Sequence, residues 1–167
     1  MPSIKEVIEK LAAENRDLEE RKKRNEEAAA VEKERIKQLT IEGCLNLLRT
    51  SEAKEILEDL NQTVLEGQGE ILQGSGTREL ISYDDYSTYS TQVCFAHLLI
   101  LWPRGKEQRI VVEAVAHPGY SPRLYVAQHV QEALHDSREE FVEIENNKKI
   151  KESTRQAVAN VFLRLPH

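Results

Sequence analysis

The amino-acid sequence predicts an α+β protein in which a long, charged N-terminal helix precedes a mainly antiparallel sheet of four to five strands packed by helices. Three observations support this fold class. Residues 3–42 contain neither glycine nor proline, the middle of the chain changes from helical spacing to runs of β-branched and aliphatic residues, and helical spacing returns near the C-terminus. We therefore divide the 167 residues into a helical arm, 1–40, and a globular α+β domain, 41–167.

The arm is rich in Glu, Lys, Arg, Ala and Leu, which are strong helix formers. Acid-before-base pairs four residues apart, such as Glu20 with Arg24, add roughly 0.2–0.5 kcal/mol each. An apolar seam in one a/d heptad frame defines the predicted arm interface: Ile4, Val7, Leu11, Leu18, Asn25 and Ala28. Glu14 and Arg21 interrupt this frame at d positions, so we expect a short, imperfect coiled coil, with a single solvated helix as the alternative. An Asn at an a position favours a dimer.

Two helices and a set of short strands are expected next. Helical spacing continues to Thr50, and Ser51 is expected to cap a second helix. The apolar stripe of that helix is Ile56, Leu57, Leu60 and Val64. Residues 69–73 and 78–83 are short strand candidates separated by a turn at Gly74-Ser75-Gly76, and the polar residues up to 90 are expected to form a loop or an exposed edge.

The core of the sheet is predicted from residues 91–102 and 109–117, which are apolar and joined by a hairpin. His97 and Glu113 interrupt these strands. They lie directly opposite each other if paired residue numbers add to 210, whereas a shift of one residue places them on different faces. The sequence leaves both registers open.

The C-terminal part is expected to contain two helices around one strand. Ser121-Pro122 provides an N-cap and a first-turn proline for a helix with Ala127, Val130 and Leu134 on one face. Residues 140–144 form the expected strand, and residues 150–165 the final helix.

Charge and composition exclude several classes of function. The arm is balanced, with ten acidic and ten basic residues, so the net charge of -6 lies in the domain and argues against a nucleic-acid partner. Two cysteines do not form the framework of a secreted protein. The N-terminus lacks signal-peptide features, and the apolar run at 93–102 is too short to span a bilayer. We expect an intracellular, cytoplasmic protein without a membrane segment.

The candidate polar pocket consists of Asp84, His97 and Glu113, because ionisable groups on apolar strands are costly to bury unless paired. The glycines at 67–76 fit no nucleotide-binding fingerprint. No cofactor, metal ligand or catalytic residue is assigned.

Asp84, Asp85 and Glu113, with the expected element order over residues 52–145, resemble restriction-endonuclease-like nucleases. The segment Glu113-Ala114-Val115 departs from their Glu-x-Lys motif because it has no lysine. The resemblance therefore implies a degenerate, inactive relative. Our leading hypothesis is a non-enzymatic assembly or adaptor protein whose arm forms a homodimer or docks on a protein partner. The alternatives are the degenerate nuclease-like domain and a small-ligand-binding domain centred on Asp84, His97 and Glu113.

Overall fold

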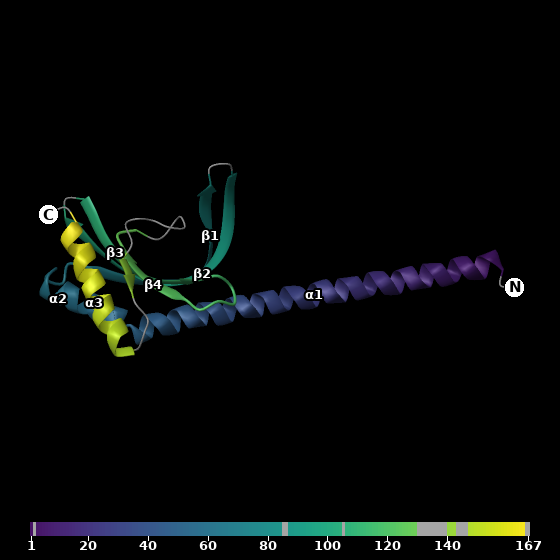
Figure 1. Cartoon of the computed structure of the whole chain (residues 1–167), viewed down its shortest axis with the longest axis horizontal. Coiled ribbons are helices and arrows are strands. Elements are labelled where there is room, and N and C mark those ends of the chain that lie inside the picture. Colours follow the sequence, from purple (N-terminus) through teal and green to yellow (C-terminus); the bar gives the residue numbers. More distant parts are fainter. Residues whose placement is uncertain (2, 85–86, 105, 130–139, 143–146, 166–167) are drawn as a thin grey trace. The chain divides into compact units, whose positions relative to one another are not determined.

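The computed structural model describes the chain except for residues 2, 85–86, 105, 130–139, 143–146 and 166–167, and it confirms the α+β fold class (Figure 1). The helices are α1 (Ile4–Thr50), α2 (Ala53–Thr63) and α3 (Asn147–Arg164). The strands are β1 (Glu70–Asp84), β2 (Ser87–Arg104), β3 (Lys106–Ala116), β4 (Arg123–Ala127) and β5 (Glu140–Val142). The chain divides into two compact units, Met1–Ile36 and Lys37–His167.

The first unit is the helical arm, and local interactions stabilise it. Its first turn carries a capping box that the sequence analysis missed: the Glu6 amide donates to Ser3 Oγ at 3.3 Å, and the Ser3 amide donates to Glu6 Oε2 at 2.7 Å. The predicted pair of Glu20 and Arg24 is formed at 3.3 Å. Every side chain from Ser3 to Arg35 is exposed.

The second unit is built on a five-stranded antiparallel sheet with the strand order β1-β2-β3-β4-β5. Every strand therefore pairs with its neighbour in the sequence. In the β2–β3 ladder the paired numbers add to 210, so His97 lies directly opposite Glu113. Of the two registers that the sequence left open, this is the one that places both side chains on the same face.

The helices cover one face of the sheet and form the main core with it. Alternate residues of β2, β3 and β4 point toward the C-terminal turns of α1, toward α2 and toward α3. The fully buried side chains in this core include Leu57, Ile100, Ile110, Leu124, Ile150 and Val161. Burying aliphatic side chains of this size contributes about 1.5–3 kcal/mol each, so this layer accounts for most of the apolar stabilisation of the unit.

The other face carries a smaller apolar cluster of Leu80, Val93 and Val115, with Phe95 and Tyr125 packed against it. Because side chains alternate along a strand, His97 and Glu113 point to this second face rather than into the helical core.

The Gly74-Ser75-Gly76 turn was predicted wrongly. The two short strand candidates are one continuous strand, β1, which pairs with β2 along its whole length. Gly74 lies opposite His97, whose ring occupies the space that a side chain on the glycine would take, and Gly76 lies opposite Phe95, whose ring would be in van der Waals contact with such a side chain. The glycines therefore serve close packing inside a strand and not a change of direction.

The helix predicted to begin at Ser121-Pro122 is also wrong, because residues 123–127 form strand β4. Leu124 and Val126 alternate into the helical core while β4 pairs with β3, and this packing prevails over the local capping signal. Val130 and Leu134 lie outside the described residues. In the described residues, strand β4 takes the place of the first turns of the helix on which the resemblance to restriction-endonuclease-like nucleases relied.

The junction between α1 and α2 corrects a further detail. Ser51 does not cap α2; its hydroxyl donates to the Leu48 carbonyl, and Glu52 takes the cap position with a left-handed φ of 55°. The Glu52 carboxylate pairs with Lys151 on α3. The expected final strand and helix are present as β5 and α3, and among the described residues no helix has an apolar stretch long enough to cross a membrane.

Candidate functional site

A buried ion pair lies on the second face of the sheet and includes a residue that the sequence analysis missed. Glu113 is 3% exposed, and Arg78 from β1 donates to both of its carboxylate oxygens, from Nη1 at 2.5 Å and from Nη2 at 2.6 Å. Because β2 lies between β1 and β3, the Arg78 side chain reaches across one whole strand to make this contact. The pair thus links the edge strand to the centre of the sheet.

Aromatic rings lie beside the ion pair. The His97 ring stacks on Phe95 with a centroid distance of 5.5 Å and an interplanar angle of 10°, and the Arg78 guanidinium lies 4.7 Å from the centroid of Phe95. His97 Nδ1 is 3.7 Å from Glu113 Oε1, which is an electrostatic contact longer than a hydrogen bond. The four side chains form one cluster, which we call the Arg78–Glu113 cluster: Arg78, Phe95, His97 and Glu113.

Opposing effects act on the pKa of Glu113. Burial raises the pKa, while the hydrogen bonds from Arg78 and the proximity of His97 lower it, and the net result is a pKa below the ordinary value. The carboxylate is therefore held in its charged form by its neighbours. Such an arrangement stabilises a fixed geometry, since both oxygens already accept hydrogen bonds.

Asp84 does not lie with the other two residues of the candidate pocket. On β1 it pairs with Ser87, whereas Gly74 pairs with His97. Ten residues of strand separate these two positions, or roughly 33 Å at about 3.3 Å per residue. The structure thus brings His97 and Glu113 together and adds Arg78, but it places the Asp84 backbone near the end of the hairpin.

The arrangement around Glu113 is unfavourable for a metal-dependent nuclease. A metal ion at Glu113 would have to displace the Arg78 guanidinium from both carboxylate oxygens. Within the described part of the chain, no group of three or more His, Cys, Asp or Glu side chains is arranged to hold a metal.

The two cysteines are buried free thiols, and Cys44 belongs to the core between the helices and the sheet. Cys44 on α1 lies 3.8 Å from the Cys94 carbonyl oxygen, and Cys94 lies 3.7 Å from the Lys37 carbonyl oxygen. Burial raises the pKa of the Cys44 thiol to about 12, with a smaller contribution from Cys94. A thiol with such a pKa is a weak nucleophile at neutral pH.

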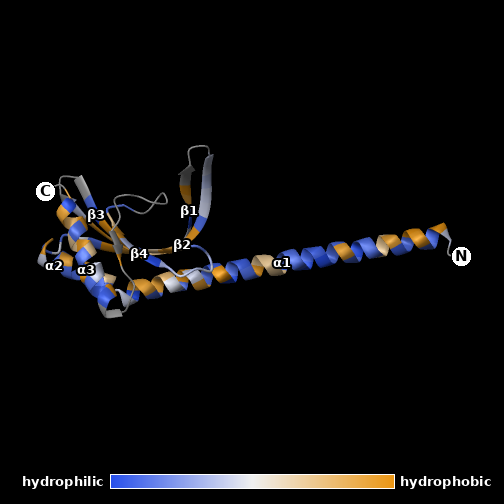
Figure 2. Cartoon of the chain, viewed as in Figure 1, coloured by the Kyte–Doolittle hydropathy of each residue, from blue (hydrophilic) through white to orange (hydrophobic). Residues whose placement is uncertain are grey.

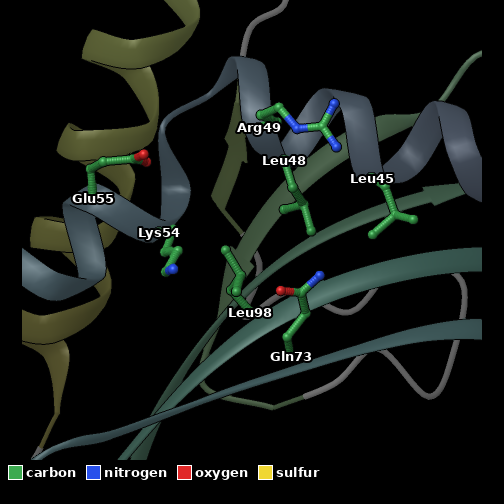
Figure 3. A pocket seen from close by; sticks show the side chains of 7 residues that line it. All are labelled: Leu45, Leu48, Arg49, Lys54, Glu55, Gln73 and Leu98. Carbon is green, nitrogen blue, oxygen red and sulfur yellow. The ribbon is translucent and has the colours of Figure 1, made fainter.

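A small pocket lies between the end of α1, the start of α2 and strands β1 and β2 (Figure 3). Leu45, Leu48 and Leu98 form its apolar part, while Arg49 and Lys54 provide positive charge. The volume is about 220 Å³, below the roughly 300–1,000 Å³ that is usual for small-molecule sites. Both cations also have partners, since Arg49 donates to Asn46 at 2.9 Å and Lys54 is 3.8 Å from Glu58. Glu55 and Gln73 complete the polar part of the lining, and the small volume is what argues against a site for a drug-sized ligand.

The arm carries an exposed apolar stripe. Ile4 is 82% exposed and Leu11 53%, and every other predicted interface residue, Val7, Leu18, Asn25 and Ala28, is exposed as well. Ile8, which the heptad frame omitted, completes an i, i+3, i+4, i+7 set at the tip and is also exposed. Figure 2 shows this apolar tip on α1, followed by hydrophilic turns. We call Ile4, Val7, Ile8, Leu11 and Leu18 the arm stripe.

Comparison with known proteins adds no family assignment: no known protein family, no curated protein and no solved structure matches the chain.

Proposed function

We propose that this chain is a non-enzymatic assembly protein whose helical arm associates with the arm of a second copy. The observation that carries the proposal is the arm stripe, in which five large apolar side chains lie exposed on one side of α1. Four of these side chains, Ile4, Val7, Ile8 and Leu11, are neighbours on the helix surface, and an exposed apolar patch is typical of a protein–protein interface. Burying one such side chain contributes about 1.5–3 kcal/mol, so covering the stripe would offset the cost of association.

Two further features support an association of helices. The i, i+3, i+4, i+7 spacing at the tip is the spacing by which one helix packs against another. Asn25 follows in the same frame as Ile4 and Leu11, and a polar residue at such a position favours a dimer over larger bundles. The charged residues between Leu11 and Asn25 limit the length of the apolar contact, so we expect association in the micromolar range.

The geometry of the Arg78–Glu113 cluster supports a structural role for the polar residues of the domain. Both carboxylate oxygens of Glu113 accept hydrogen bonds from within the chain. A residue used in this way stabilises the sheet, and this agrees with an assembly protein better than with an enzyme.

The test is a substitution in the arm stripe. Leu11→Asp places a charge in the proposed contact, where it would be desolvated without a partner. Light scattering on the full chain at micromolar concentration should report a lower mass for this variant than for the wild type. Ala13→Asp is the matched control, because Ala13 is exposed on the other side of the helix and receives the same charge. Equal masses for all three proteins would contradict the proposal.

A further inference from the structure

Strand β1 forms one edge of the sheet and is long for an edge strand. It pairs with β2 along all fifteen of its residues, and no described strand lies on its other side. Its extensive contacts with described elements are those with β2. The outer edge therefore presents a row of backbone donors and acceptors of the kind that can pair with another strand.

Few charged side chains on β1 oppose pairing of this edge with another strand. Residues 71–77 carry no charged side chain, the Arg78 guanidinium is held by Glu113, and Glu70 and Glu79 on either side of this segment are exposed. Two large apolar side chains on β1 remain exposed, Leu72 at 41% and Ile81 at 40%. Natural edge strands usually carry charges, prolines or bulges that prevent pairing, so a mostly uncharged edge of this length is unusual in a single chain.

The sequence of this edge is nearly palindromic about Gly76. Residues 71–81 read Ile-Leu-Gln-Gly-Ser-Gly-Thr-Arg-Glu-Leu-Ile. Positions at equal distances from Gly76 carry the same or a similar residue in four of five cases: Ile71 and Ile81, Leu72 and Leu80, Gln73 and Glu79, Ser75 and Thr77. Such mirror symmetry is what an antiparallel strand needs in order to match itself.

We propose that β1 pairs antiparallel with β1 of a second copy of this chain, about a twofold axis through Gly76, so that the two sheets join into one. Paired residue numbers then add to 152. Leu72 meets Leu80 of the second copy, and Ile81 meets Ile71 of the second copy. The pairing places both exposed apolar side chains opposite apolar residues, of which Leu80 is already buried against Val93 and Val115 of its own chain, and it places no like charges opposite each other.

The neighbouring registers are less favourable. A twofold axis perpendicular to the sheet keeps each side chain on its own face, so the register can change only in steps of two residues. If the sum is 150, Arg78 lies opposite Leu72 and Glu79 opposite Ile71. If the sum is 154, Leu80 lies opposite Gly74 and Ile81 opposite Gln73. Only the sum of 152 matches apolar residues with apolar residues at both ends, which is why we assign it.

A cysteine experiment tests both the pairing and its register. Ser75 and Thr77 are exposed and lie directly opposite each other across the proposed axis. Directly opposed Cα atoms are about 4.5–5.5 Å apart, within the range of about 4.4–6.8 Å that a disulfide needs. If both copies carry the cysteine at the same residue number, the two cysteines are offset by two residues along the paired strands. Their Cα atoms are then roughly 8 Å apart, which is too far for a disulfide.

Full-length Ser75→Cys, full-length Thr77→Cys and an equal mixture of the two are oxidised mildly, with the wild type as the control for the buried native thiols. We expect cross-linked dimers in the mixture, and intact mass spectrometry should identify them as containing one chain of each variant. Efficient cross-linking of either variant alone would show a different register and overturn the assignment. No cross-link in any sample would overturn the pairing itself.

A second experiment separates this edge from the arm. The cysteine test is repeated in the Leu11→Asp background, where arm association is disrupted and edge pairing is expected to persist. Adding Leu72→Lys to the cysteine variants should reduce cross-linking at least tenfold without changing the far-ultraviolet circular dichroism. Leu163→Lys, at an exposed position on α3, is the matched control and should leave cross-linking unchanged. If Leu72→Lys and Leu163→Lys behave alike, the proposal is wrong.

Discussion

The imidazole of His97 lies against the backbone of Gly74, its direct partner on the neighbouring strand. A Cβ atom on Gly74 would stand 2.7 Å from His97 Nε2, closer than Cβ atoms approach non-bonded heavy atoms in folded proteins. The ring can therefore stack on Phe95 and approach Glu113 only because residue 74 has no side chain. The absence of a side chain on one strand thus determines the position of a ring on the next.

Gly74→Ala should destabilise the domain by about 1–3 kcal/mol, because the added methyl group displaces the His97 ring from a packed position. The measurement is the free energy of unfolding from urea denaturation. Ser75→Ala, at the exposed neighbouring residue, is the control and should stay within about 0.5 kcal/mol of the wild type. A Gly74→Ala variant as stable as this control would show that the His97 position is not constrained by the glycine.

Glu113→Gln should lower the free energy of unfolding by about 3 kcal/mol or more, since it leaves the Arg78 guanidinium largely buried without its counter-charge. The double variant Arg78→Leu with Glu113→Leu removes both charges and should lose less stability than Glu113→Gln. Denaturant titrations of the wild type, of Arg78→Leu and Glu113→Leu separately, and of the double variant measure the coupling. Additive losses would mean that the pair does not act as a unit.

The stabilisation from Glu113 should depend on pH in a defined direction. Its pKa in the folded protein is below the ordinary value, so the contribution is complete above the unfolded pKa of about 4.3 and is lost as the pH falls through the folded pKa. Thermal midpoints of the wild type and Glu113→Gln, measured from pH 7 to pH 2, should therefore converge at the acidic end. If the two thermal midpoints differ by the same amount at every pH in this range, the stabilisation does not come from the charged Glu113 carboxylate.

The Cys44 thiol should be unreactive in the folded protein. With a pKa raised to about 12 by burial, it has almost no thiolate at pH 8. A disulfide reagent added at this pH should label Cys44 only after unfolding in denaturant, and mass spectrometry of peptides identifies the labelled residue. Fast labelling of Cys44 under native conditions would indicate that the contact between α1 and β2 opens readily.

Much of the fold could be predicted because the relevant signals are local. The apolar runs at 91–102 and 109–117 predicted the β2–β3 hairpin, and the absence of glycine and proline from residues 3–42 predicted the long helix. The glycines of β1 were misread as a turn because their role depends on His97 and Phe95, which lie on another strand. At β4 the Ser-Pro capping signal was strong, but pairing with β3 decided the conformation.

The candidate site could be predicted only in part, for the same reason. His97 and Glu113 were noticeable because each interrupts an apolar strand, and one of two registers brings them together. Arg78 was missed because it lies in a polar segment and its partner is 35 residues away. A usable signal was present: a carboxylate in a buried strand requires a cation, and Arg78 is the only lysine or arginine between residues 55 and 103.

The meander order of the sheet has a consequence for how the domain folds. Each strand pairs with the one next to it in sequence, so the sheet can grow hairpin by hairpin without first closing a large loop. The contacts that join distant parts of the chain, such as those of Cys44 with Cys94 and of Glu52 with Lys151, involve the helices. Loop-closure entropy is therefore concentrated in the docking of α1 and α3, which we expect to limit the folding rate.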